Sequence, residues 1–488
     1  MRAWEWGARD RASHPQGRAG RGRSDVAMTA RPGPRVVLSG LGVLVAAGIA
    51  IRAGAAATVL IWFDEATRGL MAGDVLHGHF PLFFYGQSFN GAVDAYLHAM
   101  MFAALGDSVA ALRTWSVLVS LGHVAMVGLL ARRTFGSGRW AIAIALVPSP
   151  FLLKWAADAR LVYGLQLILT PVCLILTMTA VEGRSMSSRT RALLVLALVG
   201  GLSWWINLLL APILAACAVT LLLRWPRLGR AAIMTPLAFL LGSAPIWLFA
   251  AVYGRLPIVS VPHAPRRAIM EHTRNLLTNA LPMVIGVPHD ALVTRALGWI
   301  ALAVFGAGAL LALADRRGDP TGRLLIGLAT AIPLAAVVVT ERGQTLATED
   351  PRYLLPILAI LPVLLGAALA RVARRRPAWA GVAVVGLLVA HAAGVATGYP
   401  ALRSASAWRE ARGALALPYL FLAYNLVLFL FVHAKTRFRV PFLPVLLVFA
   451  AIAVTRLGGD DRSRHSPGRL VAGAAVAALA LYVAFVDL

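Results

Sequence analysis

The chain has 488 residues, of which 59% are hydrophobic and 14% charged, and its mean hydropathy is +0.75. A soluble domain is about half apolar and about a quarter charged, so these values exclude a soluble enzyme, a disordered protein and a fibrous protein. Lys and Arg number 46 against 21 Asp and Glu, which gives a formal net charge of +25. The arginines fall between long apolar runs, where cytoplasmic loops carry positive charge, so we expect membrane lipids and no nucleic acid as partners.

The N-terminal segment differs from the rest of the chain. Residues 1–35 are rich in Arg, Gly and Pro, and we expect a basic, disordered, cytoplasmic N-terminus there. Met28 offers a second start, which would leave residues 1–27 untranslated.

Apolar runs of roughly 20 residues predict membrane-spanning helices along the remaining chain. Arginine-rich linkers at 132–133, 184–191, 224–230, 315–323 and 371–376 fall on the side of the N-terminus, as the positive-inside rule requires of cytoplasmic loops. The sequence therefore predicts an all-α polytopic membrane protein with about 12–14 spans. The expected spans are 36–52, 108–131, 138–153, 161–181, 192–205, 207–223, 231–252, 292–314, 324–340, 353–370, 378–397, 416–432, 440–455 and 469–486.

The segments on the opposite side hold most of the carboxylates and histidines, and the first of them, 53–107, is the most informative. Two adjacent acids, Asp64 and Glu65, directly follow an apolar run. A carboxylate at the membrane interface can act as a general base. The alternative is the first turn of a helix, where acidic residues are favoured by the helix dipole.

A fixed order of short segments follows this acidic pair. The chain continues with His-Gly-His-Phe-Pro at 77–81 and an aromatic-glycine stretch from 85 onward. The half-apolar pattern of 93–105 predicts a helix lying in the interface plane. A Leu-Gly-Asp-Ser turn at 105–108 then leads into the next span, where Ala-Leu-Arg at 111–113 places an arginine near the outer end.

This ordered set resembles the polyprenyl-phosphate-sugar-dependent glycosyltransferases of the GT-C fold, which include protein O-mannosyltransferases and lipid A aminoarabinose transferases. The resemblance is best over 40–180. It implies a GT-C-like catalytic membrane core over 36–400, with interfacial helices in the first outside loop and further membrane helices over 401–488. It also implies inverting transfer of a sugar from a polyprenyl-phosphate donor to a hydroxyl of a glycan, lipid or protein acceptor. The active site would be extracytoplasmic, in the bacterial plasma membrane.

The resemblance also suggests which acids act in catalysis. The family's first acidic residue is the catalytic base, which corresponds here to Asp64, with Glu65 beside it. The second outside loop of the family often carries another acid, and Asp158 in the stretch 154–160 matches it. The alternative for this stretch is a boundary cluster whose long basic side chains reach toward the headgroups.

The family places an arginine before a late span to meet the lipid phosphate. Arg352 and Tyr353 match this feature on the outer side, and Arg437 before 440–455 is the alternative. Either arginine can instead simply set the topology. The resemblance suggests three further basic residues near the phosphate: Arg113, Lys154 and Arg160.

Metal dependence is left open by the sequence. Some family members bind a divalent metal ion through a carboxylate at the position of Asn90, and the nearest acid here is Asp94. His79 is a further candidate for a metal or acceptor contact, although a short His-Gly-His is also a common loop feature.

Two other interpretations remain at this stage. Apolar residues at helical spacing over 269–280 predict an amphipathic helix, either interfacial with basic residues near the headgroups or a simple loop helix.

A multi-span transporter or lipid flippase would also explain the spans, but it predicts ionisable residues in mid-span and internal repeats. The acids gather on one side instead, which favours an enzyme at the interface.

Overall fold

The computed structural model describes residues 34–58, 61–224, 231–257, 263–286, 292–315, 317–347 and 351–376, together with 383, 386, 387 and 391. The chain divides into two units, Met1–Gly42 and Val43–Leu488. Of the first unit, only the beginning of one helix is described. The catalytic residues expected from the sequence, except Arg437, fall within the described part of the second unit.

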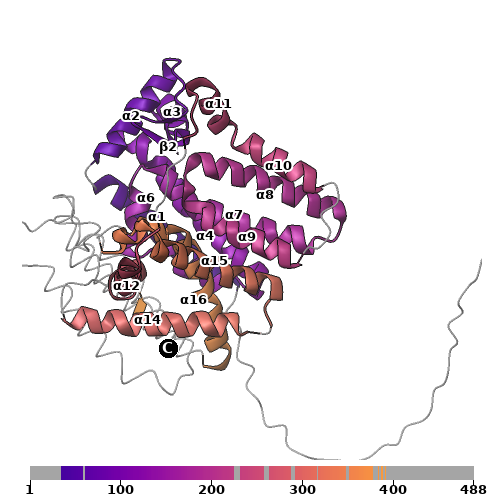
Figure 1. Ribbon diagram of the computed structural model, residues 1–488. Helices are drawn as coiled ribbons and strands as arrows, with labels where there is room; N and C mark the ends of the chain where they lie inside the picture. The colour runs from indigo at the N-terminus through magenta and orange to yellow at the C-terminus, as the bar shows by residue number, and fades with distance from the viewer. Residues whose placement is uncertain are drawn as a thin grey trace, which may run out of the picture. The chain divides into compact units, whose positions relative to one another are not determined.

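Helices make up almost all regular structure in the described residues (Figure 1). The short elements η1, η3 and η4 are 3₁₀-helices, and η2 is a π-helical turn. In chain order the elements are α1 (Pro34–Thr58), α2 (Phe63–Leu76), β1 (Phe83–Phe84), β2 (Gln87–Gly91), α3 (Val93–Leu105), α4 (Val109–Phe135), α5 (Arg139–Leu146), α6 (Pro150–Ala157), α7 (Leu161–Glu182), α8 (Met186–Ile206), η1 (Leu208–Leu210), α9 (Ala211–Arg224), α10 (Ala231–Gly242), α11 (Ala244–Tyr253), α12 (Arg266–Asn275), η2 (Leu276–Ala280), α13 (Leu281–Ile285), α14 (Leu292–Leu313), α15 (Pro320–Val339), η3 (Glu341–Ala347), η4 (Arg352–Leu354) and α16 (Leu355–Arg375).

Within the described residues, five helices are long and apolar enough to cross a membrane: α4, α7, α8, α15 and the continuous η4–α16. Two bent pairs, α5–α6 with a 72° bend and α10–α11 with a 66° bend, raise the number to seven if each pair is one span. Each span expected between 36 and 370 coincides with a helix or a bent pair, which confirms the all-α polytopic class. Of the four spans expected after residue 376, the structure describes only residues 383, 386, 387 and 391 of the span 378–397.

Small residues allow the closest helix contacts. Helix α10 lies along α8, and α8 lies along α7 (Figure 1). A Cβ atom at Gly201 would lie 2.1 Å from the Phe239 carbonyl oxygen, and one at Gly242 would lie 2.1 Å from that of Leu198. Close backbone approach at small residues is a common way for membrane helices to associate.

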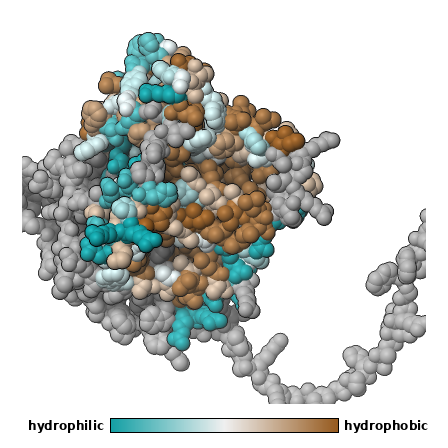
Figure 2. Space-filling view, viewed as in Figure 1, coloured by the Kyte–Doolittle hydropathy of each residue, from teal (hydrophilic) through white to brown (hydrophobic). Residues whose placement is uncertain are grey.

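Hydrophobic side chains cover the outer surface of this helix group. Figure 2 shows a broad hydrophobic area over α7–α10 and more hydrophilic side chains where α2 and α3 lie. Leu222, Ile233 and Leu241 expose 70% or more of their surface here. Such a large exposed apolar area is typical of a surface that contacts lipid.

The bend between α5 and α6 is held by a buried arginine on α1. Arg52 is 0% exposed and donates hydrogen bonds to the carbonyl oxygens of Ala145 (2.8 Å) and Leu146 (2.9 Å), and to Ser120 Oγ (2.8 Å). Carbonyls at a helix C-terminus lack partners within the helix and favour a positive charge. Ser149 then caps α6, which begins in a new direction.

A short β-hairpin, which the sequence did not predict, lies between the helices α2 and α3. Strands β1 and β2 pair in antiparallel fashion, and Gly86 takes a φ of 78° in the turn between them. The hairpin rests on the end of α8, where Trp205 Nε1 donates to the Leu82 carbonyl oxygen at 2.8 Å. The helix predicted in this loop is confirmed, because α3 occupies Val93–Leu105.

Candidate active site at the start of helix α2

The acidic pair lies in the first turn of α2, a position that the sequence left open as the alternative to a catalytic role. Helix α2 begins at Phe63, and Asp64 and Glu65 are the acids of its first turn. The Trp62 backbone N–H donates to Glu65 Oε2 at 2.9 Å, which satisfies a donor that the helix itself leaves unpaired. The two adjacent carboxylates nevertheless have different surroundings.

Glu65 is buried and fully paired. Arg113 on α4 donates to both of its oxygens, Nε to Oε1 at 3.0 Å and Nη2 to Oε2 at 2.9 Å. The Ala159 backbone N–H donates to Oε1 at 2.8 Å. Glu65 therefore joins the beginning of α2 to α4 and to the loop before α7, and its lone pairs are occupied.

Asp64 is partly open and close to one cation. Its side chain is 28% exposed, and Oδ2 lies 3.8 Å from Arg160 Nη1. Within the described residues, no side-chain or backbone donor hydrogen-bonds to this carboxylate, whereas its backbone oxygen accepts from Arg68 Nη1 at 2.9 Å. Its carboxylate oxygens are thus available to accept a proton from another molecule.

Arg160 lies between Asp64 and Asp158. Arg160 Nε donates to Asp158 Oδ2 at 2.7 Å, and the Arg160 backbone N–H donates to Asp158 Oδ1 at 2.9 Å. Burial by itself would raise the pKa of Asp158, but the charge and hydrogen bonds of Arg160, with a smaller contribution from Lys154, outweigh it and lower the pKa. Asp158 therefore stays ionised at neutral pH and neutralises much of the Arg160 charge.

An aromatic ring joins Arg160 to the arginine expected at the donor phosphate. The Tyr163 ring centroid lies 5.9 Å from the Arg160 guanidinium carbon and 5.7 Å from that of Arg352. Arg352 Nη1 also donates to the Tyr163 hydroxyl at 3.4 Å. Next to Arg352, Tyr353 accepts a hydrogen bond from Arg342 Nη1 at 2.7 Å. The structure thus brings Asp64, Asp158, Arg160, Arg352 and Tyr353 into one neighbourhood.

The other candidate residues lie in different settings. Asp94 is fully buried and forms an ion pair with Arg68 on α2. His79 lies in an exposed turn after α2, and its backbone N–H donates to the Asp74 carbonyl oxygen at 3.0 Å. Lys154 on α6 lies over the Trp155 ring, with Nζ 5.4 Å from the centroid. Arg437 lies outside the described residues.

The residues around the expected metal position do not fit a metal site. Asn90 accepts a hydrogen bond from Asn207 Nδ2 at 2.7 Å, and the nearest acid, Asp94, is already paired with a cation. Within the described residues, no group of three or more His, Cys, Asp or Glu side chains is placed to hold a metal ion.

Sequence reasoning missed the aromatic residues and one arginine of this site. Tyr163 lies three residues after Arg160, a spacing that places both side chains on the same side of the beginning of a helix. Sequence reasoning missed it because a tyrosine at the beginning of an apolar run is typical of a core residue. Trp155, whose ring centroid lies 4.8 Å from the Arg160 guanidinium carbon, is hidden in the same way. Arg342 is eleven residues before Tyr353 and gave no local signal.

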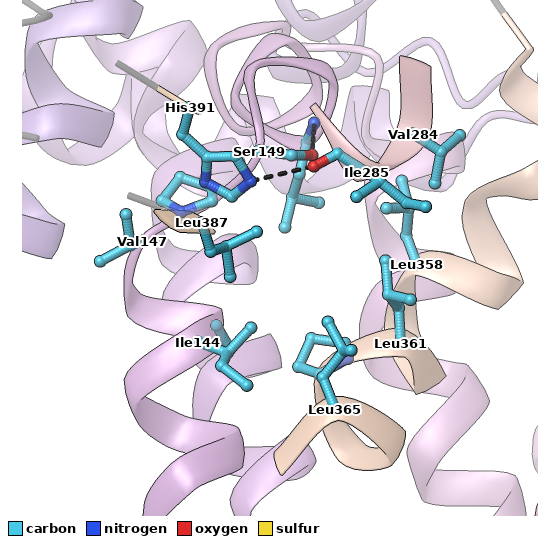
Figure 3. Close-up of a pocket in the computed structure, with 14 residues that line it drawn as sticks. Ile144, Val147, Ser149, Val284, Ile285, Leu358, Leu361, Leu365, Leu387 and His391 are labelled. Atoms are coloured by element: carbon cyan, nitrogen blue, oxygen red, sulfur yellow. Dashed lines mark hydrogen bonds between the residues drawn. The ribbon is translucent and has the colours of Figure 1, made fainter. Parts of the chain in front are cut away.

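An apolar cavity lies along two helices that begin or end at this site (Figure 3). It lies between the α5–α6 bend, α13 and α16 and is partly open to solvent. Figure 3 shows Leu358, Leu361 and Leu365 of α16 around it, and His391 reaching the Ile285 carbonyl oxygen at 3.0 Å. At 1.5 Å per residue, Leu358 and Leu361 are about 9–14 Å along the helix from Arg352.

Comparisons with known proteins support the fold through structure alone. No family model and no curated protein matches the chain. Two crystal structures of ArnT from Cupriavidus metallidurans are similar, one bound to undecaprenyl phosphate and one in the apo state. Each has a TM-score of 0.56 and 15% sequence identity, covering 87% and 86% of this chain and 76% of the ArnT chain. This similarity confirms the GT-C-like membrane fold that the sequence resemblance predicted.

Proposed function

We propose that this protein is a membrane glycosyltransferase that moves a sugar from a polyprenyl-phosphate donor to an acceptor hydroxyl. The observation that carries the proposal is the position of Asp64. This partly open carboxylate lies 3.8 Å from Arg160, and the guanidinium groups of Arg160 and Arg352 both lie close to the Tyr163 ring. The helix that begins after Arg352–Leu354 also lines an apolar cavity. This reaction needs a base for the acceptor hydroxyl, a cation for the donor phosphate and an apolar cavity for the lipid chain.

In the proposed reaction Asp64 accepts the proton of the acceptor hydroxyl as its oxygen attacks the anomeric carbon. The bond from that carbon to the phosphate oxygen breaks, and the electron pair leaves with the phosphate. Arg352, with the Tyr353 hydroxyl, stabilises the charge on the leaving phosphate through a fixed guanidinium. One displacement inverts the configuration at the anomeric carbon.

The neighbouring charges position this base. The Glu65–Arg113 pair fixes the first turn of α2 and therefore the backbone of Asp64. Asp158 neutralises Arg160 in part, so Arg160 does not capture Asp64 in a tight ion pair, as the 3.8 Å separation indicates. Lys154 adds positive charge on the same side. The mechanism includes no step through a metal ion.

The lipid part of the donor is assigned to the apolar cavity. A polyprenyl chain is purely hydrocarbon, and the residues of α16 that line the cavity, Leu358, Leu361, Pro362 and Leu365, are apolar. Helix α16 begins directly after Arg352–Leu354. The ArnT structure with undecaprenyl phosphate supports a donor of this class. We place the protein in the bacterial plasma membrane, with a cytoplasmic N-terminus and an extracytoplasmic site, because the arginine-rich linkers lie opposite the Asp64 side.

Lipid transport without chemistry is the competing function. Arg52 is an ionisable group buried in a span, as transporters often have, but it is engaged with backbone carbonyls of α5. The decisive experiment incubates the purified protein in lipid nanodiscs with a set of polyprenyl-phosphate sugars and candidate acceptors. We expect free polyprenyl phosphate and an acceptor sugar of inverted configuration, detected by mass spectrometry and NMR. Movement of intact donor across vesicles without its cleavage would instead identify a transporter.

A further inference from the structure

Arg342 is a half-buried cation whose partner is neutral. Its Nη1 donates to the Tyr353 hydroxyl at 2.7 Å, and its guanidinium carbon lies 5.1 Å from the centroid of that ring. Within the described residues it forms no ion pair with a carboxylate. A guanidinium removed from water usually pairs with an anion, so this side chain suits an anion that arrives with a ligand.

The backbone around Arg342 is held firmly. Just before η3, the Val339 carbonyl oxygen at the end of α15 accepts a hydrogen bond from the Ala264 N–H at 3.0 Å. Within η3, the Leu346 carbonyl oxygen accepts one from Asn279 Nδ2 of η2 at 2.6 Å. The His272 ring fills the space next to Gly343, where a Cβ atom would lie 2.1 Å from its Nδ1. Because the backbone is fixed, the Arg342 guanidinium stays within reach of the Tyr353 hydroxyl and of the space next to it.

Arg342 and Arg352 act on the same tyrosine. Tyr353 follows Arg352 directly in η4, and its hydroxyl lies within electrostatic range of both guanidinium groups and of Tyr163. A phosphate held by Arg352 and the Tyr353 hydroxyl would therefore lie near the guanidinium of Arg342. The site presents two cations to one phosphate.

The number of cations matches the charge that develops in the reaction. The donor is a phosphodiester and carries one negative charge. When the bond from the anomeric carbon to the phosphate oxygen breaks, the electron pair stays on that oxygen, and the leaving phosphate monoester carries up to two charges at neutral pH. A group that meets only the second charge lowers the barrier without tightening donor binding.

We propose that Arg342 is a further catalytic residue that binds the second negative charge of the leaving polyprenyl phosphate. This inference rests on the proposed function. Arg352 meets the charge that is present throughout, and Arg342 turns from the Tyr353 hydroxyl to the phosphate oxygen as that oxygen gains its electron pair. The acceptor proton goes to Asp64, so protons and charges balance.

The test compares two ligands that differ by one charge. Polyprenyl phosphate is the dianion, and its methyl ester is a monoanion that mimics the donor phosphodiester. The affinity for each ligand is measured in nanodiscs for three proteins: the wild type, Arg342→Gln and Arg352→Gln. We expect the wild-type protein to prefer the dianion, Arg342→Gln to lose that preference by about 10-fold or more, and Arg352→Gln to weaken both ligands.

Kinetics give a second measurement. Arg342→Gln should lower kcat for transfer by about 10²–10³-fold with little change in the donor KM. Arg342→Lys should restore part of the rate, and Arg274→Gln, an exposed arginine on α12, serves as the matched control with unchanged kinetics. An unchanged dianion preference in Arg342→Gln would overturn the inference. Failure of the wild-type protein to bind either ligand would overturn the proposed function itself.

Discussion

Two adjacent acids in this protein have different surroundings, which is why we propose different roles for them. Glu65 has four donated hydrogen bonds from Arg113, Ala159 and Trp62, while Asp64 faces a partly open space with one cation 3.8 Å away. A carboxylate whose lone pairs are all occupied by donors has no free oxygen with which to accept a proton from a substrate. The residue proposed as the base is therefore the less well bonded of the two.

The first prediction concerns the buried Glu65–Arg113 pair. The substitution Glu65→Gln leaves the Arg113 guanidinium buried without its counter-charge, so we expect a loss of about 3–5 kcal/mol in stability and a clear fall in Tm. Thermal melting of the purified protein measures this change. The double variant Glu65→Leu with Arg113→Leu should recover most of the loss. A Tm for Glu65→Gln equal to that of Asp107→Asn, a change at an exposed acid, would contradict this role.

The residues that sequence reasoning found and those it missed differ in a physical way. Asp64 and Arg352 follow or precede apolar runs, where a charge is conspicuous, and they could be identified from sequence order. The pairing of Arg160 with Asp158 is local and also visible in the sequence. Tyr163 and Arg342 join the site only through the packing of α7 against η4 and of η3 against α12, which no local pattern reveals.

At the scale of elements, the contact between the hairpin and α8 requires a glycine at position 91. A Cβ atom at Gly91 would lie 2.6 Å from the Trp205 carbonyl oxygen and 3.0 Å from its ring carbon Cε2. Both neighbours are fixed, because Trp205 also donates to the Leu82 carbonyl oxygen. This contact sets the position of the hairpin on the end of α8.

We therefore predict that Gly91→Ala lowers the stability by about 1–3 kcal/mol through overpacking. Gly73→Ala is the matched control: nothing lies within 4 Å of a Cβ atom there, so in the helix α2 it should raise stability slightly, by up to about 1 kcal/mol. Melting temperatures of the two variants should move in opposite directions. Equal shifts would show that the hairpin contact is unimportant.

Helix boundaries were largely predictable, whereas bends and the hairpin were not. Apolar length alone located α4, α7 and α15 to within a few residues. The bend after α5 depends on Pro148, Ser149 and a distant cation, Arg52, that caps the broken end. The two strands of the hairpin are too short for an alternating pattern to appear in the sequence.

At the scale of the whole molecule, the apolar cavity is lined in part by α16, the helix that begins directly after Arg352–Leu354 of the charged site. Arg352 opens this span, and Leu358, Leu361 and Leu365 follow on it toward the membrane interior. A long lipid can therefore keep its phosphate at the charged end and its chain in the cavity. This arrangement predicts that a mutation in the cavity changes the preference for lipid chain length without changing how the phosphate is bound.

Leu365→Trp should fill part of the cavity and weaken binding of a long-chain donor by about 1–3 kcal/mol, seen as a raised KM. A donor with a short prenyl chain does not reach this depth and should be affected little. Leu310→Trp, at a residue on α14 that is 70% exposed, is the control. If both donors lose binding equally, the cavity does not hold the chain.

The most direct measurement is sugar transfer by Asp64→Asn beside Asp74→Asn, a second acid on the same helix. Both substitutions remove one charge from α2, but Asp74 accepts from the Tyr85 hydroxyl at 2.7 Å and lies outside the catalytic group. Asp64→Asn should fold normally, bind the donor and lose about 10²–10⁴-fold in turnover, while Asp74→Asn stays close to wild type. Near-normal transfer by a folded Asp64→Asn protein would contradict the proposed role of Asp64 as the base.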